Sequence, residues 1–155
     1  MVTLKDIEAL DTFLGNRDIK YVLTGTSALF FHGCLPDCTQ VHDIDIVVPV
    51  TDETRGPIET ALSELEQFSR CEHNNSGYDG RVYVFKAGDN VTVNAFLGNP
   101  NVAEMPESQT MLIDEHEIQV HNVIPALRAK FKLGRKKDFE FFHKLVNQLT
   151  TLFKY

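Results

Sequence analysis

The order of elements over residues 20–48 constrains the fold more than any other feature of this sequence. Residues 20–24 (KYVLT) have the apolar and β-branched character of a short strand, and Gly25 then turns the chain into a helix over residues 27–32. After a polar loop, residues 43–48 (DIDIVV) form a second strand. Two strands separated by a helix are typical of helices packed against a sheet, so a mixed fold is predicted.

The rest of the chain adds helices near both ends and further strands between them. Apolar residues at helical spacing predict a helix over residues 3–14 and another from Asp52 or Thr54 to about residue 68. We therefore predict an α+β fold, with an α/β mixed sheet and C-terminal helices. The remaining expected elements are strands at 81–86, 91–97, 111–113 and 117–123, a loop at 99–110, and a helical segment over 125–153 broken at Gly134.

Length and composition limit the class of protein. The 155 residues suit one domain, with a core over about 3–123 and a helical segment over about 124–155. Hydrophobic residues make up 43% and charged residues 24%, which excludes a disordered chain and a disulfide-dense scaffold. No apolar run approaches the roughly 18 residues that a membrane span needs, and the start lacks the pattern of a signal peptide. With three cysteines in no repeating framework, we expect a cytoplasmic protein without a membrane partner.

The charge balance argues against one class of partner. The formal net charge is −7, whereas a protein that binds nucleic acid over its whole surface is normally basic. A local basic groove remains open, because Lys130, Lys132, Arg135, Lys136 and Lys137 form one basic stretch. Such a stretch is either a solvated helix face or a confined patch that attracts phosphate groups.

Two aspartates alternate with isoleucines in the second strand. Side chains alternate across a strand, so Asp43 and Asp45 share one face while Ile44 and Ile46 point into the core. Adjacent carboxylates repel each other, and a divalent cation relieves that repulsion. The pair is therefore a candidate site for Mg²⁺ (or Mn²⁺) together with substrate phosphates, the alternative being two solvated acids at a strand edge.

The glycine turn before the first predicted helix is a second candidate site. Gly25 permits close approach to the backbone, and the hydroxyls of Thr26 and Ser27 can donate to phosphate oxygens. The alternative is an ordinary helix cap. A phosphate-binding turn and a metal-binding carboxylate pair in one strand–helix–strand unit are what nucleotidyl transfer requires.

These segments resemble a known superfamily. The pattern of VLTGTSAL followed by DIDIVV, with Gly25, Asp43 and Asp45, is similar to that of nucleotidyltransferases with the DNA polymerase beta-like fold. The chain looks most like the small branch that includes abortive-infection and other toxin nucleotidyltransferases. The segment VIPALRAKFKLGRKKDFEFF resembles the C-terminal helix of many of these proteins at Lys130, Arg135, Lys137 and Asp138, and the likeness runs from about residue 4 to 147.

The resemblance implies a minimal nucleotidyltransferase fold with C-terminal helices. It also implies metal-dependent transfer of a nucleoside monophosphate from a nucleoside triphosphate to a hydroxyl on RNA (for example tRNA), protein or a small molecule. In such a site Asp43 and Asp45 hold the metal. The implied nucleotide-binding residues are Gly25, Thr26, Ser27, Lys130, Arg135 and Lys137.

Two positions depart from the family pattern. Thr26 stands where glycine or serine is usual, and Asn94, in the strand at 91–97, stands where a third carboxylate is usual. An amide can ligate a metal through its oxygen, but it adds no charge and is no base. Asp89 is a candidate substitute. Asn94 therefore keeps a second hypothesis open, that of a catalytically impaired nucleotide-binding or regulatory module.

Two further hypotheses concern metal binding and assembly. His32, Cys34, Cys38, His42, Cys71 and His73 lie in two groups, which suggests either a structural zinc site or incidental thiols. Apolar residues at 139, 141 and 142, with Leu145, Leu149 and Phe153, predict core packing of the last helix. The excess apolar face is a candidate contact for a second copy or a partner subunit.

Overall fold

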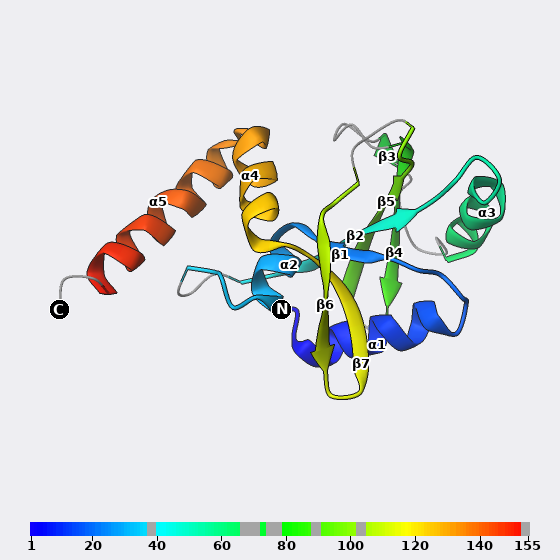
Figure 1. The fold of residues 1–155 in the computed structure, drawn as a ribbon, viewed down its shortest axis with the longest axis horizontal. Helices are drawn as coiled ribbons and strands as arrows, with labels where there is room; N and C mark the ends of the chain where they lie inside the picture. Colours follow the sequence, from blue (N-terminus) through cyan, green and yellow to red (C-terminus); the bar gives the residue numbers. More distant parts are fainter. Residues whose placement is uncertain (37–39, 66–71, 74–78, 88–90, 102–104, 153–155) are drawn as a thin grey trace.

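A mixed sheet forms the centre of the computed structural model, which describes residues 1–36, 40–65, 72–73, 79–87, 91–101 and 105–152. In these residues seven strands are arranged in the order β3-β4-β5-β2-β1-β7-β6, with β2–β5 and β1–β7 parallel and the other pairs antiparallel (Figure 1). The predicted α+β fold class is confirmed. The strands are β1 (Val22–Thr24), β2 (Asp43–Pro49), β3 (Glu72–His73), β4 (Asp79–Ala87), β5 (Val91–Gly98), β6 (Ser108–Ile113) and β7 (His116–His121).

The N-terminal helix and the helices between the early strands pack against this sheet, whereas the two C-terminal helices contact one of these helices and each other. Thr3 and Asp6 form a capping box at the start of α1, which satisfies backbone N–H groups that the first turn leaves free. Gly134 takes a left-handed φ of 60° between α4 and α5, so the predicted break is confirmed. From there α5 extends away from the sheet (Figure 1). The helices are α1 (Leu4–Gly15), α2 (Gly25–Phe31), α3 (Arg55–Leu65), α4 (Val123–Leu133) and α5 (Lys136–Leu152).

The two faces of the central strands differ as the alternation in DIDIVV predicts. Ile44 and Ile46 are fully buried and join one core cluster with residues of α1 and α3, among them Leu10 and Leu62. Each such side chain contributes roughly 1.5–3 kcal/mol by its burial. Asp43 is exposed and Asp45 half-buried on the other face of β2. The apolar face of β2 therefore packs against α1 and α3, and the carboxylates lie on the opposite face.

Some predicted boundaries are wrong. β6 begins at Ser108 rather than at 111, because antiparallel pairing with β7 continues to the Ser108–His121 pair. The strand predicted to reach 123 ends at His121, since α4 begins at Val123. Tertiary pairing, which local composition does not encode, sets both ends.

Other differences concern short or terminal elements. The sequence did not predict β3, and α2 begins at Gly25 instead of residue 27. Phe139 is 52% and Leu149 44% exposed, so the predicted core packing of the last helix is wrong at both positions, whereas Phe141 is buried. Residues 66–68 of the predicted third helix, Asp89 and Phe153 lie outside the described residues.

Within the described part of the chain, no helix combines the length and apolar character needed to cross a bilayer. The cytoplasmic location stays a prediction.

Candidate active site

The parallel pairing of β2 with β5 brings three polar side chains together. The register places Asp45 opposite Asn94. The Asn94 amide, through Nδ2, donates to Asp43 Oδ2 at 2.9 Å and to Asp45 Oδ1 at 3.0 Å. Asn94 thus lies against the aspartate pair, at the position expected for the third acidic residue.

Asp45 is the less exposed of the two aspartates, and its pKa is raised. Burial raises its pKa, the hydrogen bond from Asn94 lowers it, and the charge of Asp43 raises it again. The positive charges of Lys137 and Arg135 lower it, but the pKa remains above its usual range. The ionised pair is therefore incompletely compensated by protein groups, which favours binding of a cation at this position.

Gly25 brings the backbone of the first turn of α2 close to this pair. Its φ is +63°, a left-handed conformation that favours glycine. A Cβ at this position would lie 2.7 Å from Asp45 Oδ2, closer than a Cβ can approach. Position 25 therefore requires glycine both for its conformation and for the space it leaves beside Asp45.

The two hydroxyl residues after Gly25 point to different partners. Ser27 is 1% exposed. Its Oγ donates to the Thr24 carbonyl at 2.7 Å and accepts the Asp45 N–H at 3.2 Å. This hydroxyl ties α2 to β1 and β2, so the structure does not direct it toward an external phosphate. Thr26 is half-buried, and its Oγ1 accepts a hydrogen bond from Lys130 Nζ at 3.3 Å.

The basic residues come from the junction of α4 and α5. The Lys130 ammonium lies 3.2 Å from Asp138 Oδ1, and Arg135 contacts the same carboxylate through Nε at 2.6 Å and Nη2 at 3.0 Å. Lys137 is exposed, and its charge, like that of Arg135, lowers the pKa of Asp45. The structure thus brings Lys130 to the Gly25–Thr26 turn and places the charges of Arg135 and Lys137 within electrostatic range of the aspartates.

Three further residues shape this region: Asp138, which sequence reasoning identified only as a match to the family's C-terminal helix, and Thr24 and His121, which it did not identify. Asp138 is completely buried beneath Lys130 and Arg135. Thr24 Oγ1 and His121 Nδ1 are 3.1 Å apart, which links the end of β1 to the end of β7. Burial lowers the pKa of His121, favouring its neutral form. In the sequence, the RKKD tetrapeptide at a helix start was the available signal for Asp138, whereas nothing local indicated the Thr24–His121 pair.

The donor set fits one kind of metal ion. The two carboxylates are hard ligands, and Mg²⁺ is usually held by one or two carboxylates plus substrate phosphates and water. The described residues contain no group of three or more His, Cys, Asp or Glu side chains placed to hold a metal. With two carboxylates, the Asp43–Asp45 pair suits a cation that binds together with a nucleotide, while the Asn94 amide hydrogen-bonds both of them.

The described residues include part of the predicted zinc site. Cys34 has a free thiol, and the His32 ring bonds to the His121 carbonyl through Nε2 at 2.8 Å. Cys38, Cys71 and the side chain of His73 lie outside the described residues. The structural zinc site stays a prediction.

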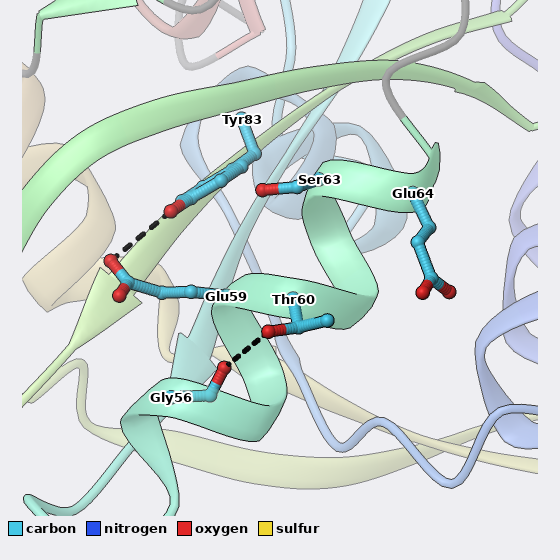
Figure 2. Close-up of a pocket in the computed structure, with 6 residues that line it drawn as sticks. All are labelled: Gly56, Glu59, Thr60, Ser63, Glu64 and Tyr83. Atoms are coloured by element: carbon cyan, nitrogen blue, oxygen red, sulfur yellow. Dashed lines mark hydrogen bonds between the residues drawn. The ribbon is translucent and has the colours of Figure 1, made fainter.

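A pocket on α3 does not belong to this site. Gly56, Glu59, Thr60, Ser63 and Glu64 line it together with Tyr83 of β4, whose hydroxyl donates to Glu59 Oε1 at 3.1 Å (Figure 2). Val84 is paired with Asn94, so the neighbouring Tyr83 points to the opposite face of the sheet. None of the predicted site residues lines this pocket.

Comparison with known proteins decides the fold. No protein-family model matches the sequence, and no curated protein matches it. Among solved structures, a candidate nucleotidyltransferase from Thermotoga maritima is 21% identical, with a TM-score of 0.58 over 94% of this chain and 92% of that one. The chain has the nucleotidyltransferase fold.

Two further solved structures share this nucleotidyltransferase fold. The antibiotic-resistance factor ANT(2'')-Ia, in complex with adenylyl-2"-tobramycin, is 16% identical, with a TM-score of 0.55 over 95% of this chain and 90% of that one. A nucleotidyltransferase-like protein from Paracoccidioides brasiliensis is 15% identical, with a TM-score of 0.51 over 88% of this chain and 70% of that one. The superfamily fold expected from the sequence is confirmed, while the abortive-infection and toxin branch stays a prediction.

Proposed function

We propose that this protein is a metal-dependent nucleotidyltransferase, which transfers a nucleoside monophosphate from a nucleoside triphosphate to a hydroxyl group. The observation that carries the proposal is the cluster of Asp43, Asp45 and Asn94 beside the Gly25 turn. Proteins with this fold that are described as nucleotidyltransferases support it.

In this proposal each residue has a defined task. Asp43 and Asp45 hold Mg²⁺ or Mn²⁺, and the Asn94 amide, which donates to both carboxylates, holds them side by side. When bound, the cation supplies charge neutralisation to the phosphates. The backbone at Gly25 and the side chains of Lys130 and Arg135 contact the β- and γ-phosphates, and Lys137 adds positive charge nearby.

The transfer is an in-line displacement. The acceptor oxygen forms a bond to the α-phosphorus, the bond from that phosphorus to the bridging oxygen breaks, and pyrophosphate leaves. Asn94 cannot accept the proton of the acceptor hydroxyl, because an amide is not a useful base. That proton passes to one of the two aspartates or to water.

The proposed acceptor is a hydroxyl on RNA, protein or a small molecule. ANT(2'')-Ia was solved with an adenylylated tobramycin, which makes a small molecule worth including. We also propose a cytoplasmic location, a toxin-type role, and contact with a second copy or partner subunit as parts of the same hypothesis.

The direct test uses labelled nucleoside triphosphates. Incubation of the protein with labelled ATP, CTP, GTP or UTP, Mg²⁺ and total tRNA should label an acceptor, and parallel reactions with protein extract and with aminoglycosides cover the other classes. Asp43→Ala should abolish the labelling. Labelling that survives this substitution would remove Asp43 from the site.

A specific observation favours a second candidate, a nucleotide-binding module without transferase activity. Asn94 already donates a hydrogen bond to each aspartate, so an amide partly satisfies the two carboxylates where a third acidic residue is usual. Nucleotide-induced thermal stabilisation without labelling of any acceptor would support this alternative.

A further inference from the structure

Asp138 is a completely buried acidic residue at the start of α5. Its carboxylate accepts hydrogen bonds from the backbone N–H of Arg135 at 3.2 Å, from Arg135 Nε at 2.6 Å and from Arg135 Nη2 at 3.0 Å. Lys130 Nζ on α4 lies 3.2 Å from Oδ1 of the same carboxylate, the oxygen that also accepts from Arg135 Nη2. One negative charge therefore holds two cations, one from each side of the Gly134 break.

These contacts fix where the Lys130 ammonium lies. It also donates to Thr26 Oγ1 at 3.3 Å and lies 4.7 Å from the centre of the Phe141 ring. An ammonium has three N–H donors, and among the described residues Asp138 and Thr26 engage two of them. The Lys130 side chain is only 13% exposed, so it is held in one place against the turn that follows β1.

The charge at this junction is unevenly balanced. Asp138 neutralises one of the two positive charges and leaves a net positive charge beside Thr26. Arg135 is 46% exposed and remains accessible to a ligand, whereas the carboxylate that orients it is not. Because a guanidinium presents its donors in a planar fork, holding Nε and Nη2 on one carboxylate fixes the direction of its remaining N–H groups.

We propose that Asp138 is a positioning residue for triphosphate binding. It holds the Lys130 ammonium against the Gly25–Thr26 turn and orients the Arg135 guanidinium on the same carboxylate, so phosphate affinity depends on a residue that touches no nucleotide. The inference rests on the proposed function, because it assigns the two cations to the nucleotide phosphates. A merely structural Asp138 would stabilise the α4–α5 corner without any selective effect on phosphates.

The experiment compares a triphosphate with its monophosphate. The probe is whichever of ATP, CTP, GTP and UTP stabilises the wild-type protein most, with the matching nucleoside monophosphate, each titrated calorimetrically with Mg²⁺. We expect Asp138→Asn to weaken triphosphate binding about tenfold and monophosphate binding less than threefold, since most of the lost contacts are to the β- and γ-phosphates. Asp11→Asn is the matched control, and its affinities should equal those of wild type.

Asp11 suits this comparison because it is also a hydrogen-bonded aspartate between elements. It accepts from the Tyr21 hydroxyl at 2.8 Å and lies 2.8 Å from His116 Nδ1, at the end of β7 opposite to His121. Its substitution removes hydrogen bonds of a similar kind, but at the end of β7 that lies away from the Gly25 turn.

A double-mutant cycle tests whether Asp138 acts through Lys130. Lys130→Met should lower triphosphate affinity, and adding Asp138→Asn to it should lower the affinity by much less than Asp138→Asn does in the wild-type background. Full additivity of the two losses would overturn the proposal.

The other outcomes are separable. Wild-type protein that binds no nucleotide would overturn the proposed function and this inference with it. Wild-type binding with an equal loss of triphosphate and monophosphate affinity in Asp138→Asn, or with no loss, would overturn the inference alone. If Asp138→Asn does not fold, Asp138→Glu carries the test: it keeps the charge but displaces the carboxylate, and wild-type triphosphate affinity in that variant would contradict the proposal.

Discussion

Asp45 and Asp138 are two aspartates with little solvent exposure, and their surroundings shift their pKa values in opposite directions. Burial raises the pKa of each. At Asp138 the hydrogen bonds and charges of Arg135 and Lys130 outweigh burial, so its pKa is lowered. At Asp45 the amide of Asn94 and the more distant cations do not outweigh burial and the charge of Asp43, so its pKa is raised.

The difference separates a group that stabilises the fold from one prepared for a ligand. A buried carboxylate with two cations is compensated within the protein. A buried carboxylate beside another carboxylate is compensated only when something else binds, and perturbed groups of this kind concentrate at functional sites. Removal of a negative charge should therefore have different effects on stability at the Asp43–Asp45 pair and at the α4–α5 junction.

The largest expected effect is the loss of transferase activity on substitution in the Asp43–Asp45 pair. Under the proposed function, Asp45→Asn should lower the rate of nucleotidyl transfer by at least about 100-fold, because loss of a proposed metal ligand removes several kcal/mol of transition-state stabilisation. The same change should leave the free energy of unfolding unchanged or raise it slightly, since it removes an incompletely compensated charge. The measurements are labelling rates and urea unfolding without metal or nucleotide. A clear loss of stability would mean that the comparison with Asp138 fails.

Next in size is the loss of stability at the α4–α5 junction. Asp138→Asn should lower the free energy of unfolding by about 2 kcal/mol, because it leaves Lys130 without its counter-charge. This destabilisation is smaller than for a fully buried ion pair, because the Arg135 side chain is 46% exposed and its guanidinium can be hydrated when the carboxylate is lost. Urea unfolding at pH 7 measures it, with Asp6→Asn as a control at the α1 cap. An unchanged midpoint of unfolding would show that the contacts of Asp138 with Lys130 and Arg135 contribute nothing to the stability of the fold.

The part of this contrast that the sequence could predict depends on local spacing. Alternation in DIDIVV is enough to place Asp43 and Asp45 on one face, and the resemblance placed Asn94 opposite them. Gly134 as a helix break is likewise a local signal. These features follow from the two-residue period of a strand and the conformational preferences of glycine.

What remained hidden depends on packing between distant segments. Ser27 has the composition of a phosphate-binding hydroxyl, yet β2 lies behind it and takes its hydrogen bond. Asp138 appears in the sequence as one charge among the exposed residues of RKKD, and only the angle between α4 and α5 buries it. The start of β6 at Ser108 is set by its partner strand, which no local pattern in 108–110 indicates.

A smaller effect should follow from restoring an acid between the two aspartates. Asn94→Asp replaces the amide that donates to both Asp43 and Asp45 with a third negative charge. Without metal, the free energy of unfolding should fall by about 1 kcal/mol from repulsion between like charges. Added Mg²⁺ should restore it, and the thermal shift with Mg²⁺ should exceed that of wild type. Asn99→Asp, just beyond the end of β5, is the control, because the Asn99 amide likewise donates to a carboxylate, Asp52 Oδ1, at 3.3 Å. Equal shifts in both variants would argue against a cation at the Asn94 position.

The smallest effect expected is a difference in pH dependence, and it has opposite signs at the two aspartates. The lowered pKa of Asp138 gives stability that is present above the unfolded pKa of about 3.9 and is lost as pH falls through the folded pKa. The destabilisation by Asp138→Asn should therefore be full at pH 7 and shrink below about pH 4. The raised pKa of Asp45 means that the fold binds the proton more tightly, so wild-type stability from this group declines as pH rises through its folded value. Asp45→Asn removes that decline, and its advantage over wild type in urea unfolding should grow from pH 4 to pH 7 instead of shrinking. Parallel profiles for the two variants would show that the two aspartates share one electrostatic environment, contrary to the geometry around them.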